Sequence, residues 1–128
     1  MDRKFIITAL AYAIIGMCLG IYMAKSGDHG HRVSHAHIML AGFVVSFIYG
    51  LCHKLWLPGT SAALVQAQFW LHQVGVLLMS LGLFLLYGQH IAVETIDPVL
   101  AISSLLLLLG MVLMLVLFIR APATPRPD

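Results

Sequence analysis

The chain has 128 residues, of which 61% are hydrophobic and only 9% are Asp, Glu, Lys or Arg, and its formal net charge is +2. Soluble domains carry about 25% charged residues, so the composition excludes an ordinary soluble domain and indicates an integral membrane protein. The sequence contains no basic run and no interleaving of basic with aromatic residues, so we expect no nucleic-acid partner. The length fits one compact domain.

Four apolar runs follow one another along the chain, each close to the roughly 20 residues that cross a bilayer. A backbone in lipid must satisfy its own hydrogen bonds, so each run is predicted to be a helix. The predicted helices cover about 5–24, 34–56, 62–87 and 98–119. They predict an all-α fold with a single four-helix transmembrane domain over 1–120 and a disordered tail over 121–128.

The first run, FIITALAYAIIGMCLGIYMA, is too long for the hydrophobic region of a signal peptide, which is typically about 7–15 residues. We therefore expect it to be a retained helix. It contains the stretch GMCLG, residues 16–20, a GxxxG motif that allows close contact with another helix. The polar stretch GDHGHR (27–32) follows and is predicted to be a solvated outer loop.

The second run opens with the stretch HRVSHAHIML, which contains His35 and His37. At 100° per residue these side chains lie about 200° apart around a helix, so one helix can hardly offer both to a single metal ion. They are either interfacial residues bonded to water or backbone, or ligands. Imidazole is the commonest metal ligand and suits haem iron, so we expect at least one of them to be a ligand.

Small residues lie on the same predicted face as His35. Gly42, Ser46 and Gly50 form a stripe below it. This stripe either packs closely against another helix or leaves a flat slot for a planar macrocycle, and the sequence leaves both readings open.

The third run places His72 roughly 15 Å from its inner end, given a rise of 1.5 Å per residue. This depth differs too much from that of His37 for the two to share one iron. His72 is therefore predicted either to bind a second cofactor or to form a hydrogen bond with Gln68 or with a neighbouring helix. Pro98 suits the first turn of the fourth helix.

Short loops predict antiparallel neighbours in an up-down-up-down bundle. Lysine and arginine mark the cytoplasmic side of a membrane protein. One side holds Arg3, Lys4, Lys54, Arg120 and Arg126, whereas the other holds Lys25 and Arg32. The distribution predicts that both termini are cytoplasmic.

The stretch SHAHIML, with its His-x-His pattern, resembles a histidine-bearing helix of haem-copper oxidase subunit I. The whole chain is similar to small bacterial four-helix proteins related to that subunit, whose second helix opens with a HAHINLLGWV-like stretch. A weaker similarity extends over QFWLHQVGVLLMSLGLFLLYG. The resemblance implies a bacterial inner-membrane protein that holds haem b, with His35 and His37 as axial ligands of the iron. The copper-site histidine pair and an HPExY-like motif have no counterpart, so proton pumping is not expected.

The resemblance also suggests an assembly. The oxidase subunit has twelve core helices in a pseudo-threefold array, and three copies of this chain would rebuild it. We therefore expect a homo-oligomer, with a trimer favoured. His35 of one chain and His37 of another would then approach opposite faces of a haem.

The predicted function is electron transfer with a redox partner, or binding of a diatomic gas; any enzymatic activity would be of the oxidoreductase type. The residues expected to bind the cofactor are His35, His37, His72, Gly42 and Ser46. One alternative is a membrane protein that binds or transports copper or zinc through the outer-face histidines His29, His31, His35, His37 and His90. Another is a structural or assembly subunit, in contact with membrane lipid and without a cofactor.

Overall fold

The computed structural model describes residues 1–122, which are helical apart from short connections and form no strand. Helix α1 spans Asp2–Ser26, α4 spans Ala62–Tyr87 and α5 spans Val93–Arg120. Between α1 and α4, one continuous helical rod is built from α2 (Arg32–His37), the π-helix η1 (Ile38–Val45) and α3 (Ser46–Leu55). This part of the chain thus has four helical rods long and apolar enough to cross a membrane, which confirms the all-α prediction.

Two helices begin earlier than the sequence indicates. The second rod begins at Arg32 rather than near residue 34, and α5 begins at Val93 rather than at Pro98. Glu94 lies in the first turn of α5, where a carboxylate interacts favourably with the positive end of the helix dipole. Pro98 is the sixth residue of α5 and lies inside the helix, where its missing N–H leaves the carbonyl of Glu94 without the usual amide donor. Pro98 therefore does not mark the helix start. Most of the expected tail, 121–128, lies outside the described residues.

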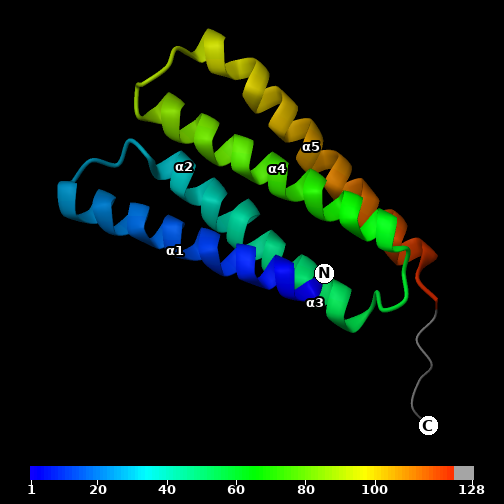
Figure 1. Ribbon diagram of the computed structural model, residues 1–128. Helices are drawn as coiled ribbons and strands as arrows, with labels where there is room; N and C mark the ends of the chain where they lie inside the picture. The colour runs from blue at the N-terminus through cyan, green and yellow to red at the C-terminus, as the bar shows by residue number, and fades with distance from the viewer. Residues whose placement is uncertain (123–128) are drawn as a thin grey trace.

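The helices pair along the chain. Helix α1 packs along the second rod, α4 packs along α5, and the second rod joins the two pairs by contacting α4. In Figure 1, α1 and α5 accordingly lie on the outside, with the second rod and α4 between them. Helix α4 is the most buried of the four. In its most apolar 18-residue segment 44% of the residues are buried, against 22% in the corresponding segments of α1 and α5.

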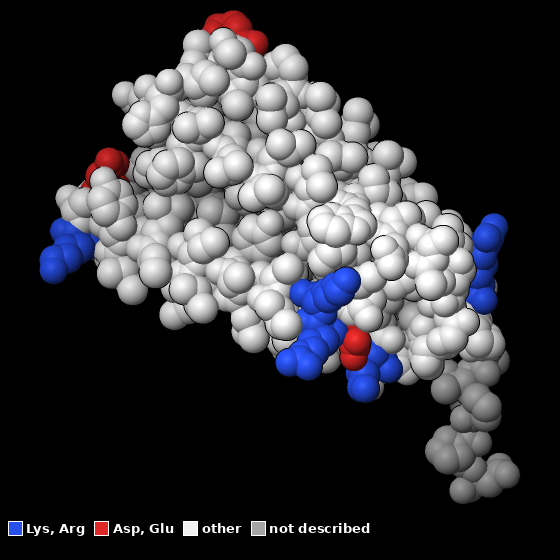
Figure 2. All heavy atoms as spheres, in the orientation of Figure 1, with Lys and Arg blue, Asp and Glu red and all other residues white. Residues whose placement is uncertain are grey.

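Charged side chains are absent from a broad band across the molecule. Figure 2 shows lysine and arginine side chains at the two ends of the helices and uncharged surface between them. The surface of the band includes large apolar side chains that are more than half exposed, such as Ile14, Ile21, Leu81 and Leu105. An apolar band flanked by charges suits a bilayer, because lipid replaces the protein contacts that these side chains lack.

The π-helix is the feature that the sequence pattern did not indicate. It occupies eight residues immediately after His37, and its backbone bonds run from residue i to i+5 rather than i+4. Longer π-helices are rare, and π turns occur frequently at functional sites. The wider turns change the angular position of the residues that follow: Gly42 and Gly50 contact α1, as His35 does, whereas Ser46 bonds to α4.

Candidate functional site

His35 is held by the first helix. Its Nδ1 lies 2.8 Å from the carbonyl oxygen of Gly16, and a Cβ placed on Gly20 would lie 3.0 Å from its Cε1. The GxxxG motif of α1 therefore makes room for an imidazole from the neighbouring helix. A carbonyl only accepts hydrogen bonds, so Nδ1 carries the proton and Nε2 keeps its lone pair.

His37 has the same tautomer but different surroundings. Its Nδ1 donates to the carbonyl oxygen of Val33, 2.8 Å away in the same helix. The residue is exposed, so its Nε2 lone pair is available to a group outside the four helices. Histidines that ligate metals usually donate their other ring N–H to a carbonyl or carboxylate in this way.

Protein atoms fill the stripe of small residues below His35. A Cβ on Gly42 would lie 2.8 Å from the ring of Tyr12, and one on Gly50 would lie 2.7 Å from Ile6. Ser46 is fully buried and bonds to a side chain of α4. The structure therefore has close helix packing at this stripe, and residues 1–122 of one chain leave no flat slot for a macrocycle at Gly42 and Ser46.

His72 bonds to the second rod rather than facing a hollow. Its Nε2 lies 2.8 Å from Ser46 Oγ, which also lies 3.4 Å from the carbonyl oxygen of Ala41. The consistent arrangement has His72 Nε2–H donating to Ser46 Oγ, whose own proton goes to the carbonyl. His72 is 1% exposed. Its Nε2 would have to give up this bond to bind a metal.

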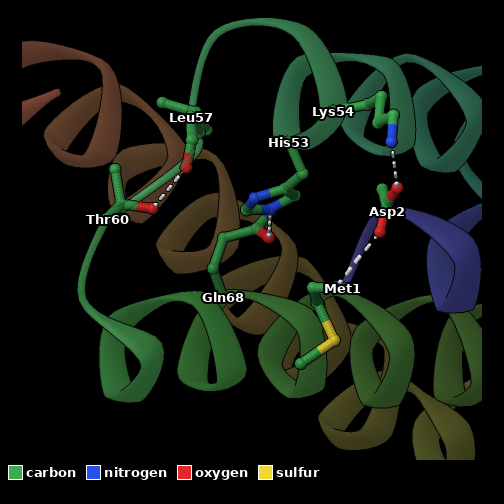
Figure 3. A network of polar contacts seen from close by, with 7 residues as sticks. All are labelled: Met1, Asp2, His53, Lys54, Leu57, Thr60 and Gln68. Atoms are coloured by element: carbon green, nitrogen blue, oxygen red, sulfur yellow. Dashed lines mark hydrogen bonds and ion pairs between the residues drawn. The ribbon is translucent and has the colours of Figure 1, made fainter.

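Sequence reasoning missed a second buried histidine. His53 of α3 shares a 3.1 Å hydrogen bond with Oε1 of Gln68, so its Nε2 carries the proton. Figure 3 shows the imidazole and the amide pointing toward one another from α3 and α4. The ring of Phe5 stacks on His53 with centroids 5.4 Å apart. Seven histidines in so apolar a chain are the signal that could have singled it out.

Phe5 is the centre of an aromatic cluster that surrounds both buried histidines. It is fully buried, and its ring packs edge-on against Tyr49 and Phe69, at 5.7 and 4.9 Å. Tyr49 in turn packs against His72 at 4.9 Å. His53 and His72 are thereby enclosed by aromatic rings, an arrangement that supports the fold and keeps both imidazoles from lipid.

Two connections at the end of the helices away from His53 each contribute one histidine: residues 27–31 before α2, and residues 88–92 before α5. His31 and His90 line one hollow of about 330 Å³, together with Tyr22 and Phe84. The ring of His31 stacks on Phe84 at 4.6 Å, and its buried Nδ1 has no hydrogen-bond partner in the structure. Across residues 1–122, no three side chains of the His, Cys, Asp and Glu types lie close enough to hold a metal ion.

Comparisons with known proteins add no relative: the chain matches no family model, no curated protein and no solved structure. The function therefore has to be argued from the histidines and their surroundings.

Proposed function

We propose that this chain is a haem b-binding protein of the bacterial inner membrane, related to haem-copper oxidase subunit I, that transfers electrons to or from a redox partner or binds a diatomic gas. The observation that carries the proposal is the shared tautomer of His35 and His37. Both donate Nδ1–H to a backbone carbonyl at 2.8 Å and leave Nε2 free. Neutral imidazole with a free ring nitrogen is the form that binds haem iron.

The chemistry of the donors fits haem, whereas the interior of a single chain does not. Tyr12 and Ile6 occupy the stripe beside His35, so a macrocycle has to lie outside the four helices. His35 and His37 lie about 200° apart around α2, which keeps both from one iron within a chain. Bis-histidine ligation of one iron would therefore need a second chain to supply one of the two ligands. Haem b would contribute one-electron chemistry, or gas binding if one axial position is open.

The contribution of the chain is to orient the two imidazoles. The carbonyl of Gly16 fixes the ring of His35 against α1, and the carbonyl of Val33 fixes that of His37 on its own helix. Each bond also raises the basicity of the ligating nitrogen. We propose a homotrimer of up-down-up-down bundles with both termini in the cytoplasm, which would bring His35 of one chain toward His37 of the next.

The visible spectrum of the purified protein tests the proposal. We expect a Soret band that shifts on reduction with dithionite, and loss of that band in His35→Ala and in His37→Ala. His29→Ala, an exposed histidine bonded only within its own loop, is the matched control and should keep the band. A wild-type spectrum in both helix-two variants would show that the ligands lie elsewhere.

A mixing experiment tests whether two chains share each site. In a cyclic trimer, each site would need His35 from one chain and His37 from its neighbour. Co-expression of His35→Ala and His37→Ala chains in equal amounts should then restore about a quarter of the haem sites, although neither variant binds haem alone. Ligands from a single chain would give no restoration, and a native mass of a monomer would exclude the trimer.

The second candidate is binding or transport of copper or zinc at the outer face. It is favoured by the hollow shared by His31 and His90, where the buried Nδ1 of His31 has no partner. A colourless protein with stoichiometric copper or zinc would support it over haem. A colourless and metal-free protein, expressed with sufficient haem, would leave the structural or assembly role.

A further inference from the structure

A groove on the membrane-facing surface contains polar groups where lipid tails would be expected. It lies between α1 and α4 and consists of two adjoining hollows of about 290 and 270 Å³, both lined by Thr8, Tyr12 and Gln73. At 1.5 Å per residue, Tyr12 lies about 15 Å along α1 and Gln73 about 16 Å along α4. Both depths lie well inside a hydrocarbon core of about 30 Å.

Gln73 is the most constrained polar group of this groove. Its side chain is buried, with a relative exposure of 8%. Its Nε2 donates to Thr8 Oγ1 at 3.0 Å, and Thr8 Oγ1 in turn donates to backbone carbonyls of its own helix. The bond to Thr8 fixes the amide plane, and the Oε1 atom has no hydrogen-bond partner among residues 1–122.

Tyr12 supplies a complementary group. Its ring packs over Gly42, and its hydroxyl likewise has no partner in the described part of the chain. Neither the hydroxyl of Tyr12 nor Oε1 of Gln73 is among the fully buried atoms without a partner, and both residues line the groove. One is a donor and the other an acceptor. Unpaired polar groups are costly in hydrocarbon, so an occupant that pairs with both is favoured over lipid tails.

We propose that this groove binds an uncharged amphiphile whose head carries a carbonyl or hydroxyl oxygen and whose tail lies in the bilayer. The argument for this occupant is chemical. The groove wall offers hydrogen bonds but no charged side chain, and its other lining residues are apolar or aromatic, including Phe69 and Trp70. Tyr12 would donate to a head-group oxygen, Gln73 would accept from a hydroxyl, and the rings would pack on the flat part of the head.

The occupant enters sideways from the membrane. Trp70 is 58% exposed and Leu77 50% exposed, so the groove opens to the lipid and not to water. The second hollow extends the first along α1 as far as Ile15, which gives a tail an apolar path. The groove shares no residue with His35 or His37, so the inference does not depend on haem.

Fluorescence of Trp70 tests this inference in the full-length protein in lipid nanodiscs. The chain has two tryptophans, and Trp56→Phe leaves Trp70 as the only one. Decylubiquinone, which carries a carbonyl ring on a ten-carbon tail and quenches tryptophan, is the probe. We expect saturable quenching, with a half-saturating concentration raised at least about tenfold in Tyr12→Phe, which loses the donor to a quinone carbonyl. A quinone has no hydroxyl to donate to Gln73 Oε1, so Gln73→Leu is tested with 1-decanol and should weaken the displacement of the quinone by that alcohol.

Gln66→Leu is the matched control, because Gln66 is an exposed residue of the same helix outside the groove and should bind like the parent. Tyr12→Phe keeps the ring over Gly42, so it tests the site even if Gln73→Leu does not fold. Competition with 1-decanol separates two sources of the same chemistry: displacement indicates a hydroxyl lipid, and no displacement indicates a flat carbonyl ring. The Soret band of the same samples reports any loss of haem separately.

Three outcomes would overturn the proposal. Quenching that rises linearly with quinone in every variant would mean simple collisions in the bilayer. Saturable quenching of Trp70 that is unchanged in Tyr12→Phe would place the quinone site elsewhere. Lipids with brominated tails provide the third outcome. If they quench Trp56 in the matched Trp70→Phe protein but do not quench Trp70, a second copy of the chain covers the groove.

Discussion

The imidazole Nδ1 of His35 and the carbonyl oxygen of Gly16 lie 2.8 Å apart, across the contact between α2 and α1. This bond connects two local motifs of the sequence: the GxxxG of the first helix contacts His35, the first histidine of the His-x-His in the second. The glycines permit the approach, and the bond in turn sets which ring nitrogen of His35 keeps a lone pair.

Substitution of Gly20 should disturb this contact. A Cβ at Gly20 would already lie 3.0 Å from His35, so the larger side chain of Gly20→Leu has to expel the ring. We expect a loss of about 1–3 kcal/mol in the free energy of unfolding, as for other overpacked sites. Unfolding in mixed micelles with increasing dodecyl sulfate, followed by circular dichroism, measures it. Cys18→Leu, at an exposed position of the same helix, should cost little; equal losses would refute the packing argument.

The tautomers of the helix-two histidines can be observed directly. Because Nδ1 of His35 and of His37 each donates to a carbonyl, Nε2 should be the unprotonated nitrogen in the neutral form of both rings. Imidazole ¹⁵N chemical shifts of the haem-free protein distinguish the two nitrogens. A protonated Nε2 in either neutral ring would contradict the ligand geometry proposed above.

The pair formed by His72 and Ser46 should show energetic coupling. Both side chains are almost fully buried and share a 2.8 Å bond. Ser46→Ala leaves His72 Nε2–H unpaired and should cost about 1–3 kcal/mol. The double variant with His72→Leu should cost less than the sum of the single ones, because the second change removes the orphaned donor. Additive losses in a double-mutant cycle would mean that the two side chains do not interact.

The pair formed by His53 and Gln68 allows a sharper replacement. Gln68→Leu alone leaves His53 without its acceptor and should cost about 1–3 kcal/mol. Adding His53→Phe removes that donor and keeps a ring stacked on Phe5, so stability should recover toward that of the parent. Gln66→Leu, an exposed position two residues earlier in α4, is the control. No recovery in the double variant would contradict the role of the hydrogen bond.

Phe5 should be the most sensitive aromatic position. It contacts Tyr49, His53 and Phe69 and is fully buried. Phe5→Ala should cost at least about 2 kcal/mol through lost packing, although less than in a water-soluble core, because lipid is as apolar as the protein interior. Phe118→Ala, 40% exposed on α5, should cost much less. The same unfolding measurement compares them, and similar losses would show that Phe5 is not a packing centre.

Much of the fold follows from patterns that are local in sequence. Four apolar runs of spanning length can only be helices in lipid, and the structure has them. The errors are also local: the sequence pattern predicts that the fourth helix starts at Pro98, but α5 begins at Val93 and contains Pro98 as its sixth residue. The π-helix could not be predicted, because its residues are ordinary apolar ones that do not distinguish i→i+5 from i→i+4 backbone bonds.

The sequence by itself determined the class of protein, the number of rods and which residues are the candidates for chemistry, since hydropathy and side-chain type are properties of single positions. The tertiary structure decided what those residues contact. In the folded chain, Gly42 packs against the ring of Tyr12. Three side-chain hydrogen bonds join residues that are distant in the sequence: Ser46 with His72, His53 with Gln68, and Thr8 with Gln73. Such contacts depend on the rotation and crossing angle of neighbouring helices. Side-chain packing between the helices determines both, and the periodicity of a single helix does not predict them.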